Sequence, residues 1–226
     1  MTEVTFFDPR DKLHFSFRTT PFRRFVVFVL GSFFKLIMKL EVQGTENLPA
    51  DGAVVLVANH VTNFDVIPMQ LSLPRPIFFM AKSSLFKFPI FEAALRDLGA
   101  FPVYRGEKDE WALRHAARVL ENGQVLGMFP EGKRSQGKGL RVAKTGSARL
   151  TLDANCPIVP MAVIGTDSFF KRFPHRTRVT IKLLPPILPK PGESALALMD
   201  RVMFALANGL PEDMRGVYAE VPKGFE

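Results

Sequence analysis

The chain is poor in cysteine, tyrosine and tryptophan. Its 226 residues include one Cys, two Tyr and one Trp. The single cysteine, Cys156, cannot form an internal disulfide, so the fold does not depend on an oxidising compartment and a reducing cytosol fits best. Cys156 stands at the entry to an apolar run, where burial is a far more common role for a cysteine than nucleophilic catalysis.

Acidic residues are outnumbered, with 22 Asp and Glu against 30 Lys and Arg, and the net charge is +8 at pH 7. Such an excess favours an anionic partner, either nucleic acid or an acidic lipid surface. The scarcity of Tyr and Trp argues against nucleic acid, because base-stacking surfaces use these side chains freely. The 22 Phe suit a protein core or contact with lipid acyl chains, and nine of them fall within the first forty residues. We therefore expect anionic membrane lipids as partners and no nucleic acid.

No apolar run is long enough for an ordinary membrane-spanning helix, which needs ~20 residues. The apolar block at 22–40 is flanked and interrupted by arginines and lysines, and its unbroken part covers only 25–34. We expect residues 1–42 to form a membrane-associating segment whose amphipathic helix lies in the interface, with its cations on acidic headgroups. A spanning helix and a buried core helix are the alternatives. A signal peptide is disfavoured, because more than twenty residues precede the two arginines and no small-x-small cleavage site follows.

Residues 43–226 alternate between strand and helix patterns, which is typical of an α/β fold with a mixed, largely parallel central sheet flanked by helices. Continuous apolar runs predict strands at 53–57, 77–81, 100–103, 125–129, 158–164 and 179–184. Helical spacing of apolar residues predicts helices at 108–122, 141–154 and 193–208. The length fits one such domain, with residues 1–42 as an appendage.

The first chemical motif is NHVTNFD at 59–65, which contains His60 and Asp65. A histidine whose imidazole is held by an aspartate can take a proton from a hydroxyl near neutral pH. Residues five apart do not share a helical face, so this pair must meet across a strand-to-helix turn. The alternative is a structural role for both residues: Asp65 caps a helix that begins at Val66, and the His60 side chain forms hydrogen bonds with backbone groups of the loop.

The second motif is FPEGKRS at 129–135, where cations follow a tight turn. Residues 130–149 carry six Lys and Arg against a single acid, Glu131. A solvated helix face mixes signs more evenly, so this one-sided charge indicates an anion site. Both motifs, and Arg105, follow predicted strands. The carboxyl ends of such strands meet at one edge of an α/β sheet, and ligands bind at that edge.

Four ordered blocks give the chain a resemblance to the 1-acylglycerol-3-phosphate acyltransferase (PlsC-like) superfamily. They are the histidine–aspartate block at 59–65, a Gly-x-hydrophobic segment with Arg105 at 99–106, the FPEG block at 129–135, and a Val-Pro followed by Gly-Thr at 159–166. One block alone is weak, whereas four in order make a specific match. The resemblance implies a single acyltransferase domain at 43–226. It also implies transfer of a fatty acyl group from acyl-CoA or acyl-carrier protein to the 2-hydroxyl of lysophosphatidic acid.

The resemblance implies roles for individual residues. His60 would be the general base that deprotonates the acceptor hydroxyl, and Asp65 would orient and stabilise its imidazolium, with no acyl-enzyme. Substrate binding would fall to six further residues: Lys82, Arg105, Glu131, Gly132, Lys133 and Arg134.

Within that set, Arg105 and Arg134 would hold the acceptor phosphate, and Glu131 and Gly132 would position the glycerol part. Backbone N–H groups near Gly132, with Lys82, are candidates for stabilising the thioester oxyanion. A surface role for Lys82 is an equal alternative. Lys133 stands where Thr is usual in the family and adds a cation at the acceptor site.

The same residues bear on other possible functions. Acylation of another lysolipid or of glycerol 3-phosphate would use the same His–Asp mechanism, and a non-catalytic acidic-membrane binding module would leave His60 unexplained. A metal-dependent hydrolase is disfavoured because no second histidine lies near His60, so we expect no metal and no cofactor beyond the thioester co-substrate. The expected location is the cytoplasmic face of the cell membrane. His115 is expected on the exposed face of its helix.

Overall fold

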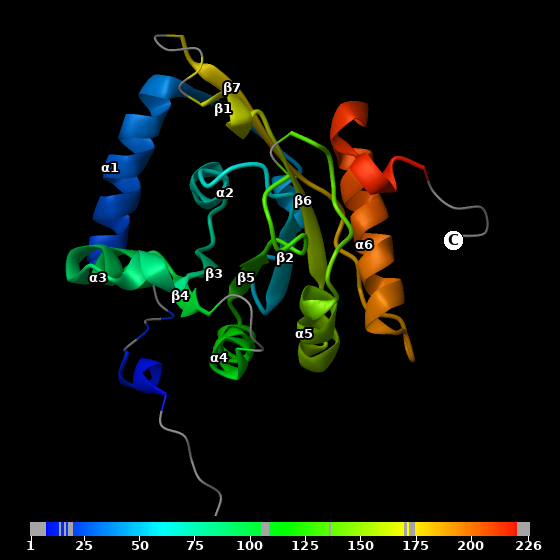
Figure 1. Ribbon diagram of the computed structural model, residues 1–226, viewed down its shortest axis with the longest axis horizontal. Helices are drawn as coiled ribbons and strands as arrows, with labels where there is room; N and C mark the ends of the chain where they lie inside the picture. The colour runs from blue at the N-terminus through cyan, green and yellow to red at the C-terminus, as the bar shows by residue number, and fades with distance from the viewer. Residues whose placement is uncertain are drawn as a thin grey trace, which may run out of the picture.

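A seven-stranded sheet with helices on both faces forms the centre of the molecule (Figure 1). The strands are β1 (Met38–Gln43), β2 (Val54–Ala58), β3 (Ile77–Lys82), β4 (Ala100–Val103), β5 (Val125–Met128), β6 (Ile158–Ile164) and β7 (Thr177–Leu183). This computed structural model describes residues 8–13, 15, 17, 20–104, 109–135, 137–169, 171 and 175–220, the side chains of 89–91 excepted.

The strands lie in the order β1-β7-β6-β2-β5-β3-β4. All neighbouring pairs are parallel except β6 and β7, so β1 and β7 run opposite to the other five strands. The expected mixed and largely parallel sheet is confirmed. Because β2, β3, β4, β5 and β6 share one direction, the segments that follow them emerge at the same edge of the sheet.

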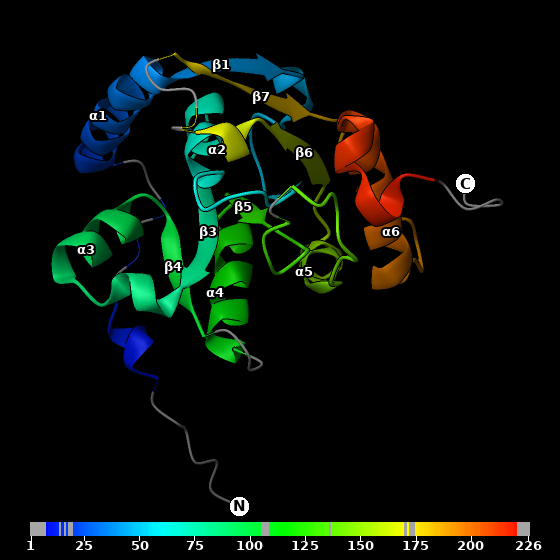
Figure 2. The same ribbon diagram turned by 45° about the horizontal axis from the view of Figure 1, so that its top comes forward.

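Two groups of helices cover the sheet (Figures 1 and 2). The helices are α1 (Pro21–Ile37), α2 (Val66–Ser72), α3 (Pro89–Asp97), α4 (Glu110–Glu121), α5 (Gly146–Ala154) and α6 (Ala195–Gly209). α4, α5 and α6 pack on one face, while α1 and α2 lie on the other with α3 beside α1. Short 3-10 turns occur at Pro9–Lys12, Thr45–Asn47, Ser83–Phe86, Thr166–Ser168, Glu212–Met214 and Gly216–Tyr218.

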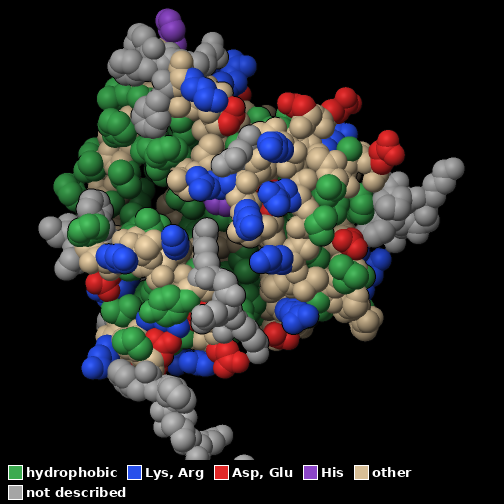
Figure 3. Space-filling model, in the orientation of Figure 1, with side chains coloured by type: hydrophobic (Ala, Val, Ile, Leu, Met, Phe, Trp, Pro, Cys, Tyr) green, Lys and Arg blue, Asp and Glu red, His purple; other side chains and the backbone are tan. Residues whose placement is uncertain are grey.

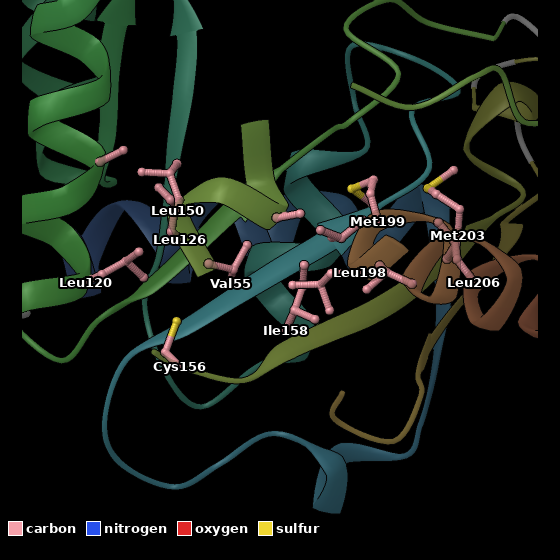
Figure 4. Close-up of a cluster of buried hydrophobic side chains, with 14 of the residues drawn as sticks. Val55, Leu120, Leu126, Leu150, Cys156, Ile158, Leu198, Met199, Met203 and Leu206 are labelled. Carbon is pink, nitrogen blue, oxygen red and sulfur yellow. The ribbon is translucent and has the colours of Figure 1, made fainter. Parts of the chain in front are cut away.

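The core forms where apolar strands meet apolar helix faces. All five residues of β2 are buried, as its unbroken apolar run predicts for a strand covered on both sides. Figure 4 shows the larger cluster, which includes Val55 and Ile158 from the sheet and Leu198 and Leu206 of α6. Cys156 is buried in the same cluster, and burial raises the pKa of its thiol to about 11, so the thiol stays protonated and packs as an apolar group.

The end of the expected membrane-associating segment is part of the sheet. Residues 38–43 form β1, which pairs in register with β7, so the expected boundary at residue 42 falls inside a strand. Residues 1–7, 14, 16, 18 and 19 of that segment lie outside the described residues. In the parts of the chain that are described, each helix is too short or too polar to cross a membrane.

His115 is buried, and the expectation that it faces solvent is wrong. Its ring stacks on Trp111 with centroids 5.0 Å apart, and Phe15 and Phe101 approach it to 4.3 and 4.6 Å. Burial lowers the pKa of His115 to about 4, so it is neutral at pH 7. The reason for the error is tertiary, because the N-terminal Phe15 and Phe17 cover the side of α4 that the sequence pattern assigns to solvent.

Helix α5 begins later than the sequence pattern predicts. Residues 141–145 are expected to be helical, but α5 begins at Gly146. The preceding backbone is bound elsewhere: the Lys144 N–H donates to the Pro130 carbonyl at 2.9 Å, and the Arg141 N–H donates to the Glu131 carboxylate at 3.1 Å. These bonds hold residues 137–145, which we call the basic loop, against the edge of the sheet, so residues 141–145 are not part of the helix.

Candidate active site

His60 and Asp65 meet at the carboxyl end of β2. The chain leaves β2 at Ala58, turns, and enters α2 at Val66. Across this turn the His60 Nδ1 lies 2.8 Å from the Asp65 Oδ2. Because a carboxylate can only accept, Nδ1 carries the hydrogen, and the Nε2 lone pair remains available as a base. The His60 side chain is 14% exposed and that of Asp65 is fully buried, so only the imidazole can reach a substrate.

The Asp65 carboxylate is an acceptor for five groups. Besides the imidazole, Oδ2 accepts from the backbone N–H groups of Val61 at 2.7 Å and Thr62 at 2.9 Å. The hydroxyls of Thr62 and Thr166 donate to Oδ1 at 3.1 and 2.5 Å. Although Asp65 stands at the N-cap position of α2, its side chain makes no capping bond. The capping alternative is therefore wrong, and the carboxylate instead fixes the turn and the imidazole.

The backbone of His60 is fixed by the segment that follows β5. The His60 N–H donates to Glu131 Oε1 at 2.8 Å, and the Ser135 N–H donates to the His60 carbonyl at 2.7 Å. The second carboxylate oxygen of Glu131 accepts from the Arg141 N–H. Glu131 is buried, which raises the pKa of its carboxyl group. The two oxygens of Glu131 thus connect the histidine turn to the basic loop by hydrogen bonds.

The imidazole is also packed from behind. The Phe129 ring stacks on His60 with centroids 4.0 Å apart, and Phe79 stacks behind Phe129 at 6.2 Å. A Cβ at Gly127 would lie 2.3 Å from the Phe79 ring, so only glycine leaves room for this stack. On the preceding residue, the Asn59 side chain donates to and accepts from the backbone of Val163, each at 2.8 Å, which joins the end of β2 to β6.

Cations gather beside this base. Gly132 has the left-handed backbone conformation, with φ at 67°, that a tight turn requires. Lys133 and Arg134 follow it and are exposed, and neither is in an ion pair within the described parts of the chain. The side chain of Lys144 lies over Gly132, since a Cβ there would meet its Cε at 3.2 Å. Figure 3 shows Lys and Arg side chains gathered in the middle of this face, next to the hydrophobic side chains over α1.

Of the remaining predicted residues, the structure describes Lys82 and Gly132. Lys82 is the last residue of β3 and is exposed at the same edge of the sheet. Arg105 lies outside the described residues, which resume at Asp109 after Tyr104. The Gly132 N–H, expected near the oxyanion, already donates to the Phe129 carbonyl at 3.1 Å.

Sequence reasoning missed several supporting residues. Thr166, which donates to Asp65, belongs to the Gly-Thr pair of the fourth block, and its approach depends on Gly165. That glycine has φ at 90°, and a Cβ there would lie 2.3 Å from the Arg178 carbonyl oxygen. Asn59 and Phe129 stand inside the quoted motifs, so their presence was a signal, but only the three-dimensional arrangement reveals what they contact.

Comparison with known proteins shows which family the chain resembles. A model of the family described as Acyltransferase matches residues 39–164. Curated relatives named 1-acyl-sn-glycerol-3-phosphate acyltransferase include one from Borreliella burgdorferi, 31% identical over 59% of this chain and 54% of that protein. Another, from Bacillus subtilis, is 33% identical over 59% of this chain and 69% of that protein. A relative of the same kind from Chlamydomonas reinhardtii is 30% identical over 81% of this chain and 56% of its own length.

A solved structure is also similar. The crystal structure of the LPA acyltransferase PlsC from Thermotoga maritima superposes with a TM-score of 0.66 and 28% identity, covering 83% of this chain and 79% of that one. The chain spans about half the length of the first curated relative it matches. The family model covers more than half of this chain, including β2, the histidine–aspartate turn and the FPEG turn. The chain therefore belongs to the acyltransferase family.

Proposed function

We propose that the protein transfers a fatty acyl group from a thioester donor, acyl-CoA or acyl-carrier protein, to the 2-hydroxyl of 1-acylglycerol 3-phosphate, forming phosphatidic acid. The observation that carries this proposal is the His60–Asp65 pair at a sheet edge where exposed cations surround an oriented base. The names of the relatives favour the same acceptor.

The imidazole would act directly on the acceptor. His60 Nε2 would take the proton of the 2-hydroxyl as its oxygen attacks the thioester carbonyl. Asp65 would stabilise the resulting imidazolium, since its carboxylate is held by donors on both oxygens. The tetrahedral intermediate then collapses, the carbon–sulfur bond breaks, and the leaving thiolate takes the proton back from His60. No covalent bond to the protein forms, so the reaction needs only one base.

The acceptor phosphate would lie on the cations that follow the FPEG turn. Arg134 directly precedes Ser135, whose N–H donates to the His60 carbonyl. The Arg134 side chain therefore leaves the backbone close to the histidine turn. Lys133 and Arg105 are the further candidates for this phosphate. We assign Glu131 to holding the histidine turn, because both of its oxygens already accept backbone N–H groups.

Replacing Arg134 with lysine tests the phosphate assignment. Lysine keeps the charge but loses the planar fork that binds two phosphate oxygens. We expect kcat/KM for lysophosphatidic acid to fall by roughly tenfold or more, as the loss of a charge-assisted hydrogen bond costs roughly 1.5–3 kcal/mol. Monoacylglycerol lacks the phosphate, so its slower acylation should be nearly unchanged. The measurement is thiol release from the acyl thioester with each acceptor.

The matched control is Arg118→Lys, an exposed arginine on α4 that should leave both rates unaltered. Equal losses on both acceptors would show that Arg134 supports the fold or the donor. The phosphate site would then have to be sought at Arg105, Lys133 or Lys144.

We further propose that the outer face of α1 rests on an anionic membrane, at the cytoplasmic side of the cell membrane. The inner face of α1 packs on α2 and β1 through Gly31 and Phe34. Its outer face carries six large apolar side chains, each at least 46% exposed: Phe22, Phe25, Phe28, Val29, Phe33 and Leu36. Such a continuous apolar stripe is typical of a membrane contact. The exposed cations Arg24, Lys35 and Lys39 suit acidic headgroups.

Changing Phe25, Phe28 and Leu36 together to serine should weaken binding to anionic phospholipid vesicles by at least roughly tenfold, since each loses apolar area that lipid would bury. Raising the salt concentration should weaken wild-type binding less than these substitutions do, because acyl-chain contact is not screened. Vesicle co-sedimentation measures both effects. The control changes Leu188, Leu196 and Val217, which are similarly exposed elsewhere, to serine. Unaltered binding of the α1 variant would place the membrane contact on another surface.

A further inference from the structure

The segment after α6, residues 211–220, is hydrogen-bonded to the basic loop. It contains two 3-10 turns, Glu212–Met214 and Gly216–Tyr218. The Leu140 N–H donates to the Met214 carbonyl at 3.0 Å, and the Val217 N–H donates to the Leu140 carbonyl at 3.1 Å. We call residues 211–220 the C-terminal clip. It lies outside the region that the family model matches, which ends at residue 164.

Two glycines allow the clip to approach the loop backbone to backbone. Gly139 and Gly216 both have positive φ, at 76° and 54°. A Cβ at Gly139 would lie 2.7 Å from the backbone of Gly216, and a Cβ at Gly216 would lie 2.1 Å from the Leu140 carbonyl oxygen. No other residue type fits at either position, so this contact is specified by the sequence.

Tyr218 adds a side-chain bond to this contact. Its ring is buried and packs edge-on against Phe204 of α6, with centroids 5.2 Å apart. Its hydroxyl oxygen accepts from the Ala143 N–H at 3.1 Å. Burial raises the pKa of the hydroxyl, so Tyr218 stays neutral at physiological pH. The clip therefore binds the loop on both sides of Arg141.

The hydrogen bonds continue from this loop to the base. Arg141 lies between Leu140 and Ala143, and its N–H donates to Glu131 Oε2 at 3.1 Å. The other oxygen of Glu131 accepts from the His60 N–H at 2.8 Å. We propose that Tyr218 is a positioning residue, which fixes the basic loop so that Glu131 holds the His60 backbone in its reactive place. The kinetic part of this inference rests on the proposed acyl transfer.

The test replaces Tyr218 with phenylalanine, which keeps the ring but removes the hydroxyl. We expect kcat/KM for lysophosphatidic acid to fall about fivefold. In a Glu131→Gln background the same change should cost less than twofold, because the substitution already breaks the connection through which Tyr218 acts. The control Val217→Ala alters an exposed side chain in the same turn, keeps the backbone bonds, and should leave the rate unchanged.

Hydrogen exchange on the full chain gives a readout that does not depend on acyl transfer. In Tyr218→Phe the amides of His60 and Arg141 should exchange roughly tenfold faster, while the sheet amide of Val55 should not change. Equal kinetic losses in the two backgrounds, or faster exchange throughout the sheet, would overturn the proposal and make Tyr218 a general stabilising residue. Faster exchange confined to His60, Arg141 and Ala143, whose amide loses its acceptor directly, in a protein that transfers no acyl group, would support the positioning role and refute the proposed function.

Discussion

Replacing His60 with alanine is expected to lower the turnover of acyl transfer by roughly 10²–10⁴, the usual contribution of a positioned acid–base group. The fold should survive, because the Asp65 carboxylate keeps the donors Val61, Thr62 and Thr166 after the imidazole is removed. We expect the free energy of unfolding to change by less than about 3 kcal/mol, because the variant loses one hydrogen bond and the stacking on Phe129, each worth at most about 1.5 kcal/mol. Thiol release from the acyl thioester and urea unfolding measure the two quantities.

His175→Ala is the matched control, since His175 is exposed near the start of β7 and should tolerate the change. Near wild-type turnover of His60→Ala would remove the base from the mechanism. Loss of cooperative unfolding would show that the histidine is needed for the fold, so either result contradicts the assignment.

Replacing Asp65 with asparagine should lower turnover about as much as His60→Ala does, but it should also destabilise the protein. The amide cannot stabilise an imidazolium as a carboxylate does, so the rate should fall by roughly 10²–10⁴. In addition, the amide nitrogen would take the place of an oxygen that accepts from several donors. We expect a loss of roughly 1–3 kcal/mol of unfolding free energy, the cost of leaving buried groups unpaired.

A substitution at a residue that donates to the same carboxylate separates the effect on turnover from the effect on stability. Thr166→Val removes only one donor to Oδ1, so it should lower stability with a much smaller loss of turnover. Asp153→Asn, at an exposed position on α5, is the matched control for the amide change. If Asp65→Asn kept wild-type turnover, another group would have to orient His60.

Much of the sheet could be predicted from local pattern. The apolar runs at 77–81, 100–103 and 158–164 correspond closely to β3, β4 and β6, because strands buried on both faces need continuous apolar side chains. β1 could not be recognised in this way. Its sequence, MKLEVQ, is half polar and follows an apolar helix, and its place in the sheet depends on pairing with β7, more than 130 residues later.

The site shows the same division. The sequence places His60 and the FPEG turn after strands, so their convergence follows from the common direction of β2 and β5. It does not reveal that Glu131 binds the His60 backbone, nor that Thr166 donates to Asp65, since these bonds join residues 71 and 101 positions apart.

By itself, the sequence determined the α/β alternation, the order of the chemical motifs and the excess of positive charge, because each depends on residues close together in the chain. Only the tertiary structure decided that His115 is buried under Phe15 and Phe17, that residues 141–145 are bound as a loop, and that the C-terminal clip closes on that loop. Those outcomes depend on which surface another segment covers. The local periodicity of a segment cannot reveal which of its faces is covered, because the residues that cover it lie elsewhere in the chain and do not change its pattern.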